Sequence, residues 1–551
     1  MTNSPSPFAR LLETNAAPLP ADIPLIHAFL CEPRQDAVHL EERAASLRRQ
    51  LAETEAALSS LRSFIAQHEG LLAPIRRVPD DVLRDIFLHT LPTSRNTVLA
   101  PIEGPLLVAG VCRNWRAIAL SMQELWASMH LVVPHEPHMP NLLETIERWV
   151  RRGGIVPLRI SMRMPVSHLQ LGPRHLLSTL VGYSKRWGDV QLLLTDAGDI
   201  EPLYRLRPED VPQLEGLELV CELASTAMMQ KPLPTAFLKT SSLRRLTLRC
   251  GYYVLPHWQT GVTWSQLTTL IIEMTPIYSH PGAVIHFPYP FLRECTNLRT
   301  FELLLTDQEL RFTVGVPAET PLFPHLENFS VRRARHMVES EHLFETFTAP
   351  KLKNVELDGN VLPSANLPAL VRPLSDIHIC SISFSVYDVS TSDLKHALTM
   401  LPHLEALLLV GDPRISQTRQ LTDSQFLEIL LPEASFIPLI PKLQSLEILQ
   451  SHGLADGLIL KVLRSRLPLG LKRFKYQTSR RPQLDLRSSL AGLGGMKLEL
   501  EYAPDDSPVS QMGVGFHREG LGELREWGHY SALVGTELDV EKGTRRGGFR
   551  M

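Results

Sequence analysis

Side chains that can do chemistry are plentiful in this 551-residue sequence, but they do not fall into a catalytic motif. No G-x-S-x-G, G-x-x-x-x-G-K-[ST] or H-E-x-x-H pattern occurs. The segment Gly513-Val-Gly515 continues with Phe-His-Arg, so it does not match a dinucleotide-binding loop. The sequence therefore predicts no catalytic residue and no cofactor.

Cysteine and histidine, the residues typical of metal and redox sites, are not grouped either. With 21 histidines, pairs such as His135 with His138 and His336 with His342 arise by chance, and we interpret them as surface imidazoles. Cys112 lies between apolar residues, which predicts a small core side chain rather than a nucleophile. The six cysteines, which form no C-x-x-C pair, are Cys31, Cys112, Cys221, Cys250, Cys295 and Cys380. Neither a metal site nor a disulfide framework is predicted.

Charged residues that alternate with leucine are the remaining candidates, and their chemistry is binding. They occur in blocks of one sign: Arg244, Arg245 and Arg249, then Glu302 and Glu356, then Lys472 and Lys475. Such blocks predict a surface that binds a protein with a complementary charge pattern. Exposed strand charges are equally expected for solubility.

Composition narrows the range of partners. The formal net charge is −3, so the chain lacks the excess of basic residues that is typical of proteins that bind nucleic acid or an anionic membrane. No apolar run reaches the 18 or so residues that span a bilayer, and the first residues contain no apolar signal core. We expect a soluble intracellular protein with reduced thiols, cytoplasmic or nuclear or both, that binds neither nucleic acid nor membrane.

Leucine dominates the chain, with 93 residues, and proline is also frequent, with 43. A six-residue pattern that is apolar at positions 1, 4 and 6 recurs at intervals of 22 to 39 residues. It begins at Ile155, Trp187, Leu214, Leu243, Leu267, Leu298, Leu326, Leu352, Leu374, Leu404, Leu443, Leu471 and Leu493. Positions 4 and 6 lie on one face of a strand, and helical stretches such as 392–401 and 423–431 lie between patterns.

This arrangement resembles an irregular leucine-rich-repeat solenoid over residues 129–501. The resemblance implies an α/β fold with a parallel concave sheet, whose non-core strand positions line the binding surface. An α/β domain with an ordinary parallel sheet is the rival interpretation. Residues 502–551 lose the pattern and are predicted to form a C-terminal cap and a polar tail.

Residues 37–73 have a seven-residue repeat that predicts one long, coiled-coil-like helix after a flexible arm at 1–36. One seam position carries Ala37, Ala44, Leu51, Leu58, Ile65 and Leu72, and the other carries Leu40, Leu47, Thr54, Leu61 and His68. A flanking position alternates in sign through Glu41, Arg48, Glu55, Arg62 and Glu69. The helix is predicted either to self-associate through 37–72 or to fold back on its own protein.

Residues 74–128 carry the most specific pattern of the chain. Asp80 suits the first turn of a helix, and apolar residues from Val82 to Leu91 share one face of it. A second helix is predicted over 106–120. The motif consists of Val78-Pro79, Leu83, Ile86-Phe87, then Val111-Cys112-Arg-Asn-Trp115 and finally Leu125-Trp126.

This motif resembles the F-box, a three-helix module. The resemblance implies that Val78, Pro79, Leu83, Ile86, Phe87, Val111, Cys112, Trp115 and Trp126 bind a Skp-type adaptor and, through it, a cullin. A three-helix cap with these side chains all internal is the alternative. F-box followed by repeats resembles a substrate receptor of an SCF-type (cullin–RING) ubiquitin ligase, which is not itself an enzyme. A leucine-rich-repeat scaffold unconnected with ubiquitination is the competing function.

Overall fold

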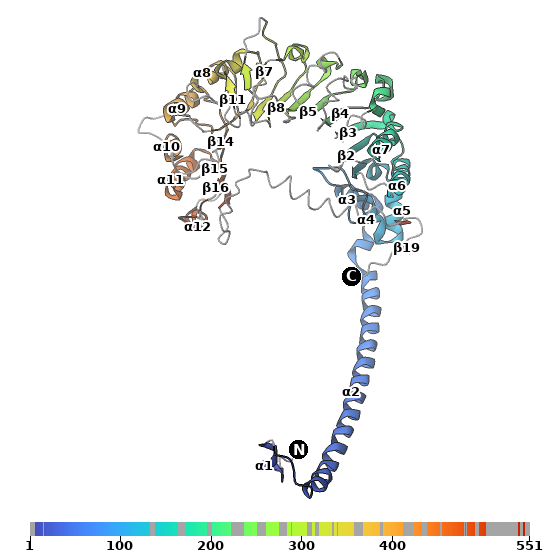
Figure 1. Cartoon of the computed structure of the whole chain (residues 1–551). Coiled ribbons are helices and arrows are strands. Elements are labelled where there is room, and N and C mark those ends of the chain that lie inside the picture. The colour runs from blue at the N-terminus through green and yellow to red at the C-terminus, as the bar shows by residue number, and fades with distance from the viewer. Residues whose placement is uncertain are drawn as a thin grey trace. The chain divides into compact units, whose positions relative to one another are not determined.

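A computed structural model gives the fold of the chain (Figure 1). It describes residues 6–502, 538–539 and 544–545, apart from internal gaps. The gaps are 15, 133–137, 164–171, 195–200, 222–235, 251–260, 275–283, 288, 306–310, 315–318, 333–335, 339, 358–366, 386–388, 411–422, 432–437, 452–453, 479, 481 and 491–494. The chain divides into two compact units, Met1–Leu83 and Arg84–Met551. The predicted C-terminal cap and tail lie almost entirely outside the described residues.

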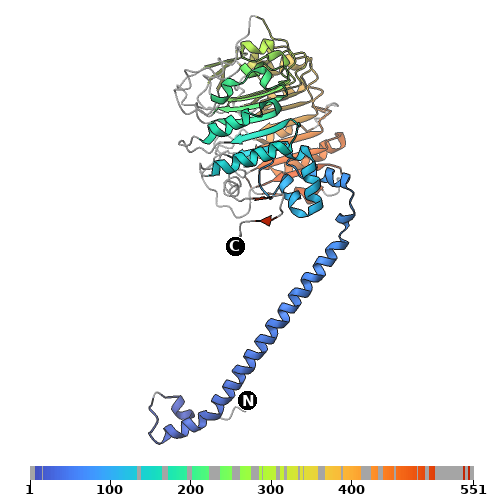
Figure 2. The same cartoon turned by 90° about the vertical axis from the view of Figure 1, so that its right-hand side faces the viewer.

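The first unit is dominated by a single helix. The helix α2 spans Asp22–Leu72 without interruption and follows the short α1 (Ala9–Leu12) (Figure 2). It begins at residue 22 rather than 37, so the prediction of a flexible arm is wrong for residues 22–36. Pro24 lies in the first turn, where a missing N–H costs nothing, and Pro33 removes only one hydrogen bond from a long helix.

Short helices follow α2. The 3-10 turn Pro74–Arg77 leads to α3 (Asp80–His89), and then come α4 (Gly104–Val111), α5 (Arg113–Ser121) and the 3-10 turn Gln123–Trp126. The single helix predicted over 106–120 is therefore two helices. The reason lies at Cys112, whose backbone is extended and whose sulfur accepts the Trp115 N–H at 3.4 Å, which caps α5.

The second unit contains one sheet of 14 parallel strands whose order in space follows the order in sequence. The sheet is not closed. Its strands are β1 (Ser128–Val132), β2 (Leu158–Arg163), β3 (Trp187–Leu194), β4 (Gly216–Cys221), β5 (Arg245–Cys250), β6 (Thr269–Met274), β8 (Thr300–Leu305), β10 (Asn328–Arg332), β12 (Asn354–Leu357), β13 (Ser381–Ser385), β14 (Ala406–Val410), β15 (Ser445–Ser451), β16 (Arg473–Thr478) and β17 (Lys497–Glu501).

Helices and 3-10 turns lie on the outer side of the curve that the strands follow (Figure 1). The helices are α6 (Met139–Arg152), α7 (Gly172–Val181), α8 (Leu367–Val371), α9 (Thr391–Thr399), α10 (Asp423–Glu428), α11 (Asp456–Arg466) and α12 (Leu486–Leu490). Turns such as Pro290–Glu294 replace the helix in the middle of the unit. A small parallel sheet is formed by β7 (Val284–Phe287), β9 (Arg311–Val314) and β11 (His336–Val338), and β18 (Leu538–Asp539) pairs with β19 (Thr544–Arg545).

The core lies between the sheet and this outer layer. Strand residues alternate between it and the opposite face, as on β8, where Phe301, Leu303 and Leu305 are buried. Most of the apolar patterns found in the sequence supply such residues. The first pattern differs, because Leu158 and Ile160 are buried whereas Ile155 is 84% exposed.

Two further patterns are out of register. The pattern from Leu374 predicted a strand at Ile377 and Ile379, but β13 begins later and buries Ile382 and Phe384. The pattern from Leu493 is two residues early, because its sixth position, Leu498, lies in β17 opposite Phe474, the fourth position of the pattern on β16. In both places two segments with the same spacing overlap in the sequence. Periodicity alone does not distinguish the segment that forms the strand from the one that comes before it.

Within the part of the chain that the structure describes, no helix is long and apolar enough to cross a membrane.

Candidate interaction surfaces

Three of the nine predicted adaptor contacts lie in the core. Leu83 is 2% exposed, and Phe87 and Trp126 are completely buried. The Phe87 ring packs against Trp115 with centroids 4.9 Å apart, and the Trp126 indole N–H donates to the Ala119 carbonyl at 2.8 Å. These three side chains hold the helices together, so the prediction that they bind a partner directly is wrong.

Other predicted contacts face solvent. Ile86 is 39% exposed and Val111 is 58% exposed, while Val78 and Trp115 are half-buried and Pro79 is exposed. These are positions at which a second polypeptide gains apolar contact area when it binds.

Cys112 is also exposed, which corrects its assignment as a core side chain. Its sulfur caps α5 rather than filling the interior. Two exposed residues lie outside the predicted set: Leu107, which is 45% exposed one turn before Val111 on α4, and Leu88, which is 37% exposed on α3. The spacing of four residues between Leu107 and Val111 was a usable signal for a shared face.

The loop between α3 and α4 attaches these helices to the sheet. Arg95 donates two hydrogen bonds to the Glu103 carboxylate, at 2.8 and 2.5 Å, and Glu103 also accepts the Val98 N–H at 2.6 Å. Val98 forms a parallel bridge with His130 of β1. Burial, reinforced by the charges of Arg95 and Arg163, lowers the pKa of His130 to about 4.

The charges predicted to bind a target lie on or beside the sheet strands, and most of them pair with an oppositely charged residue of another strand. Arg245 binds Asp189 at 3.0 Å, and Lys475 lies 3.9 Å from Glu501. Arg249 lies 2.6 Å from Glu273 and 3.9 Å from Glu218. Burial raises the pKa of Glu218, and Arg249 opposes that rise.

Two predicted residues precede their strands. Arg244 donates to the backbone carbonyls of Ser241 and Leu243, and Lys472 donates to the Gln444 side chain at 2.9 Å. These two cations therefore bind neutral groups, whereas the other five predicted charges are paired with opposite charges on other strands.

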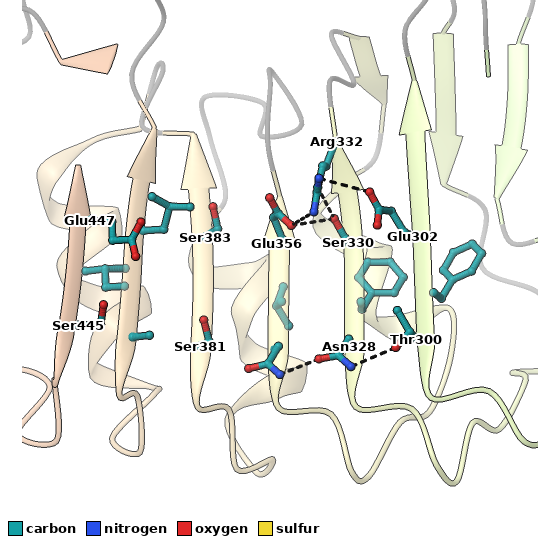
Figure 3. Close-up of a pocket in the computed structure, with 17 residues that line it drawn as sticks. Thr300, Glu302, Asn328, Ser330, Arg332, Glu356, Ser381, Ser383, Ser445 and Glu447 are labelled. Atoms are coloured by element: carbon teal, nitrogen blue, oxygen red, sulfur yellow. Dashed lines mark hydrogen bonds and ion pairs between the residues drawn. The ribbon is translucent and has the colours of Figure 1, made fainter. Parts of the chain in front are cut away.

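A pocket of about 370 Å³ lies over the strands from β8 to β15 (Figure 3). On one side Arg332 lies between two predicted residues, 3.4 Å from Glu302 and 2.7 Å from Glu356. Below them a row of amides crosses the strands, because Asn354 donates to Asn328 at 2.7 Å and Asn328 donates to Thr300 at 3.1 Å. Ladders of this kind stabilise neighbouring strands and leave amide groups at the pocket surface.

On β13, β14 and β15 the pocket is lined by the small side chains Ser381, Ser383, Ala406 and Ser445, together with Leu407, Leu408 and Glu447. Ser383 is 5% exposed, and its hydroxyl has no hydrogen-bond partner among the described residues. A buried hydroxyl without a partner costs free energy that a bound hydrogen-bonding group would recover.

The chemistry available in the pocket is hydrogen bonding and charge pairing. No histidine or cysteine lines it. Among the described residues, no group of three or more His, Cys, Asp or Glu side chains is placed to hold a metal ion. His342, one of the histidines considered for metal binding, instead lies 2.8 Å from Glu345.

Comparison with known proteins adds little. No protein-family model and no curated protein matches the chain. A crystal structure of a Bacteroides fragilis protein is similar at 13% sequence identity and a TM-score of 0.19, over 62% of this chain and 64% of that one. A likeness this weak carries no argument about fold or function.

Proposed function

We propose that this protein is the substrate-recognition subunit of an SCF-type ubiquitin ligase, acting in the cytoplasm or nucleus. Residues 74–128 serve as an F-box that binds a Skp-type adaptor, and the repeats form a leucine-rich-repeat solenoid that binds a protein target. The catalytic steps belong to other subunits, because tethering raises the effective concentration of target lysines near a ubiquitin-charged enzyme.

One observation carries the proposal: some residues of the motif are buried in the core, and others are exposed on the surface. Phe87 and Trp126 build the interior, while Ile86 and Val111 from the same motif stay uncovered on α3 and α4. A second polypeptide that covers these exposed apolar side chains would gain free energy by removing them from water. This division also disfavours the alternative of a closed three-helix cap.

The sheet supports the second half of the proposal. A doubly wound domain reverses its strand order at a switch point, whereas here the order follows the sequence through all 14 strands. Sequential stacking of strand-plus-helix units is typical of a solenoid. Because its charges are internally paired, we expect the pocketed face to select a peptide by hydrogen bonds rather than by net charge.

The adaptor half is tested by a surface variant, Ile86→Asp with Val111→Asp. Each apolar side chain covered by a partner contributes roughly 1.5–3 kcal/mol, so the double variant should lose at least about a hundredfold in adaptor affinity. The measurement is co-purification of the full chain with a purified Skp-type adaptor, followed by titration calorimetry.

Leu322→Asp provides the matched control, since Leu322 is 55% exposed elsewhere in the second unit and should leave adaptor binding unchanged. Equal binding by the double variant, or no adaptor binding by the unaltered chain, would refute the ligase assignment. The competing scaffold function predicts that second outcome together with intact binding of other partners.

The target half is tested at the small side chains of the pocket. Replacing both Ser381 and Ser445 by Leu fills the pocket and should abolish ubiquitination of a bound target while adaptor binding is unchanged. Ser241→Leu, at an exposed serine outside the pocket, is the control. Unchanged target modification in the filled variant would exclude the pocket as the recognition site.

A further inference from the structure

The helix α2 leaves its whole apolar seam uncovered. None of its 51 residues is buried, and all are described. Six large seam side chains keep between 45% and 60% of their surface exposed, namely Leu40, Leu47, Leu51, Leu58, Leu61 and Ile65, and Leu72 keeps 71%. Within the first unit, no described segment of the chain covers them.

The heptad frame identifies which residues flank the seam. Counting Ala37 and Leu40 as the two seam positions, one flank carries Glu41, Arg48, Glu55 and Arg62, and the other carries Asp36, Arg43, Gln50, Ala57 and Phe64. In a two-helix coiled coil these flanks decide whether the helices run parallel or antiparallel.

A parallel pair of copies is disfavoured by charge. In that arrangement each residue of the second flank faces the first-flank residue five positions further along the partner. Asp36 would face Glu41 and Arg43 would face Arg48, and two-fold symmetry would double each repulsion. The seam would also place Ala44 opposite Ala44 and Thr54 opposite Thr54, which leaves gaps in the core.

An antiparallel pair removes these defects when Leu47 faces Leu58 of the second copy. Glu41 then faces Arg62 and Arg48 faces Glu55, so every charged pair on that flank is attractive. This pairing is possible because the flank carries Glu, Arg, Glu and Arg in that order. An antiparallel partner presents the same residues in reverse order, so each Glu meets an Arg.

The same register matches small seam residues with large ones. Ala44 faces Leu61, Thr54 faces Leu51, and Leu40 faces Ile65 of the second copy. On the other flank Arg43 lies opposite Phe64, a ring that is 59% exposed and available for a cation–π contact. Overlap from residue 37 to 68 extends over about 48 Å of helix at 1.5 Å per residue.

We propose that the chain forms a homodimer through α2, with the two helices antiparallel and Leu47 of each copy facing Leu58 of the other. This goes beyond the ligase assignment and does not depend on it.

The oligomeric state of the full chain tests the seam. Sedimentation at micromolar concentration should give a dimer for the unaltered protein and a monomer for the Leu47→Asp, Leu58→Asp variant. Val38→Asp is the control, because Val38 is 55% exposed on α2 but lies off the seam and should leave the dimer intact. A monomeric unaltered chain, or a dimer that survives both aspartates, would overturn the proposal.

Disulfide cross-linking tests the direction in a Cys31→Ser, Cys112→Ser background. Mixing Leu40→Cys chains with Ile65→Cys chains should give a heterodimer joined through these two positions, identified by mass spectrometry. Leu40→Cys alone should not cross-link, because about 37 Å of helix separates its two copies. Efficient self-cross-linking of Leu40→Cys would show a parallel pair and refute the model of an antiparallel dimer.

Charge swapping gives a third readout. Glu41→Arg should weaken the dimer at low salt, and adding Arg62→Glu in the same chain should restore it, because the two sites face each other across the interface. Failure of the second change to restore dimerisation would contradict the register.

Discussion

At the scale of single residues, the carboxylate of Asp456 is buried, and no pattern in the sequence predicted it. Asp456 is completely buried, pairs with Arg480, and accepts the backbone N–H groups of Gln483 at 2.6 Å and Leu484 at 2.9 Å. Its burial raises the carboxyl pKa, but the hydrogen bonds from Arg480 and the backbone outweigh this and hold the pKa below its usual value.

Removing this carboxylate should be costly. Asp456→Ala removes the carboxylate that neutralises the Arg480 guanidinium, which is 16% exposed, and we expect a loss of about 3–5 kcal/mol in the free energy of unfolding. Urea denaturation measures it. The exposed pair of Glu147 with Arg151 is the comparison, because Glu147→Ala should cost less than about 1 kcal/mol.

His130 predicts a pH dependence. Its folded pKa of about 4 is below the usual 6.5, so between these values the unfolded chain binds a proton that the folded chain refuses. The free energy of unfolding therefore falls as the pH drops from about 6.5 to 4. His130→Gln should lose this part of the slope in urea titrations at pH 7 and pH 5, and an unchanged slope would disprove the assignment.

At the scale of elements, the apolar period of two placed most strands and the period of seven placed most of α2. Periodicity reports which side chains share a face, but it does not report which partner lies across from them. Arg332 is 30 residues after Glu302 and 24 before Glu356, and it meets both only because β8, β10 and β12 are neighbours. The residues that line the pocket therefore could not be grouped from the sequences of the individual strands.

Capping is a second property that local sequence specifies weakly. Ser390 precedes α9 and its hydroxyl accepts the Asp393 N–H at 3.0 Å. Ser390→Ala should cost about 1 kcal/mol in the free energy of unfolding, measured by urea denaturation. Thr399→Ala, at the other end of the helix where no cap depends on the hydroxyl, should cost less.

At the scale of the whole molecule, the second unit joins its first helices to its sheet by hydrogen bonds to backbone carbonyls. Trp149 donates to the Ser128 carbonyl at 3.2 Å, and Arg186 donates to the Val150 and Gly153 carbonyls, each at 2.9 Å. These contacts join α6 to the first strands.

Dimerisation through α2 would place two pockets in one particle, which predicts avidity. On a surface densely coated with target peptide, the unaltered chain should dissociate at least about tenfold more slowly than the Leu47→Asp, Leu58→Asp variant. On a sparse surface the two should dissociate at the same rate. Surface plasmon resonance at two coating densities makes the comparison, and equal rates on both surfaces would contradict it.

The open sheet has a consequence for solubility. Its last strand, β17, ends the row of 14, so its outer backbone N–H and C=O groups have no strand beside them among the described residues. Such an edge invites another chain to add on and start aggregation. Lys497, Glu499 and Glu501 place charges at every second position along it. An apolar strand that paired with β17 would have to displace water from all three charged side chains, which costs free energy. The charged edge therefore disfavours end-to-end association of the molecules.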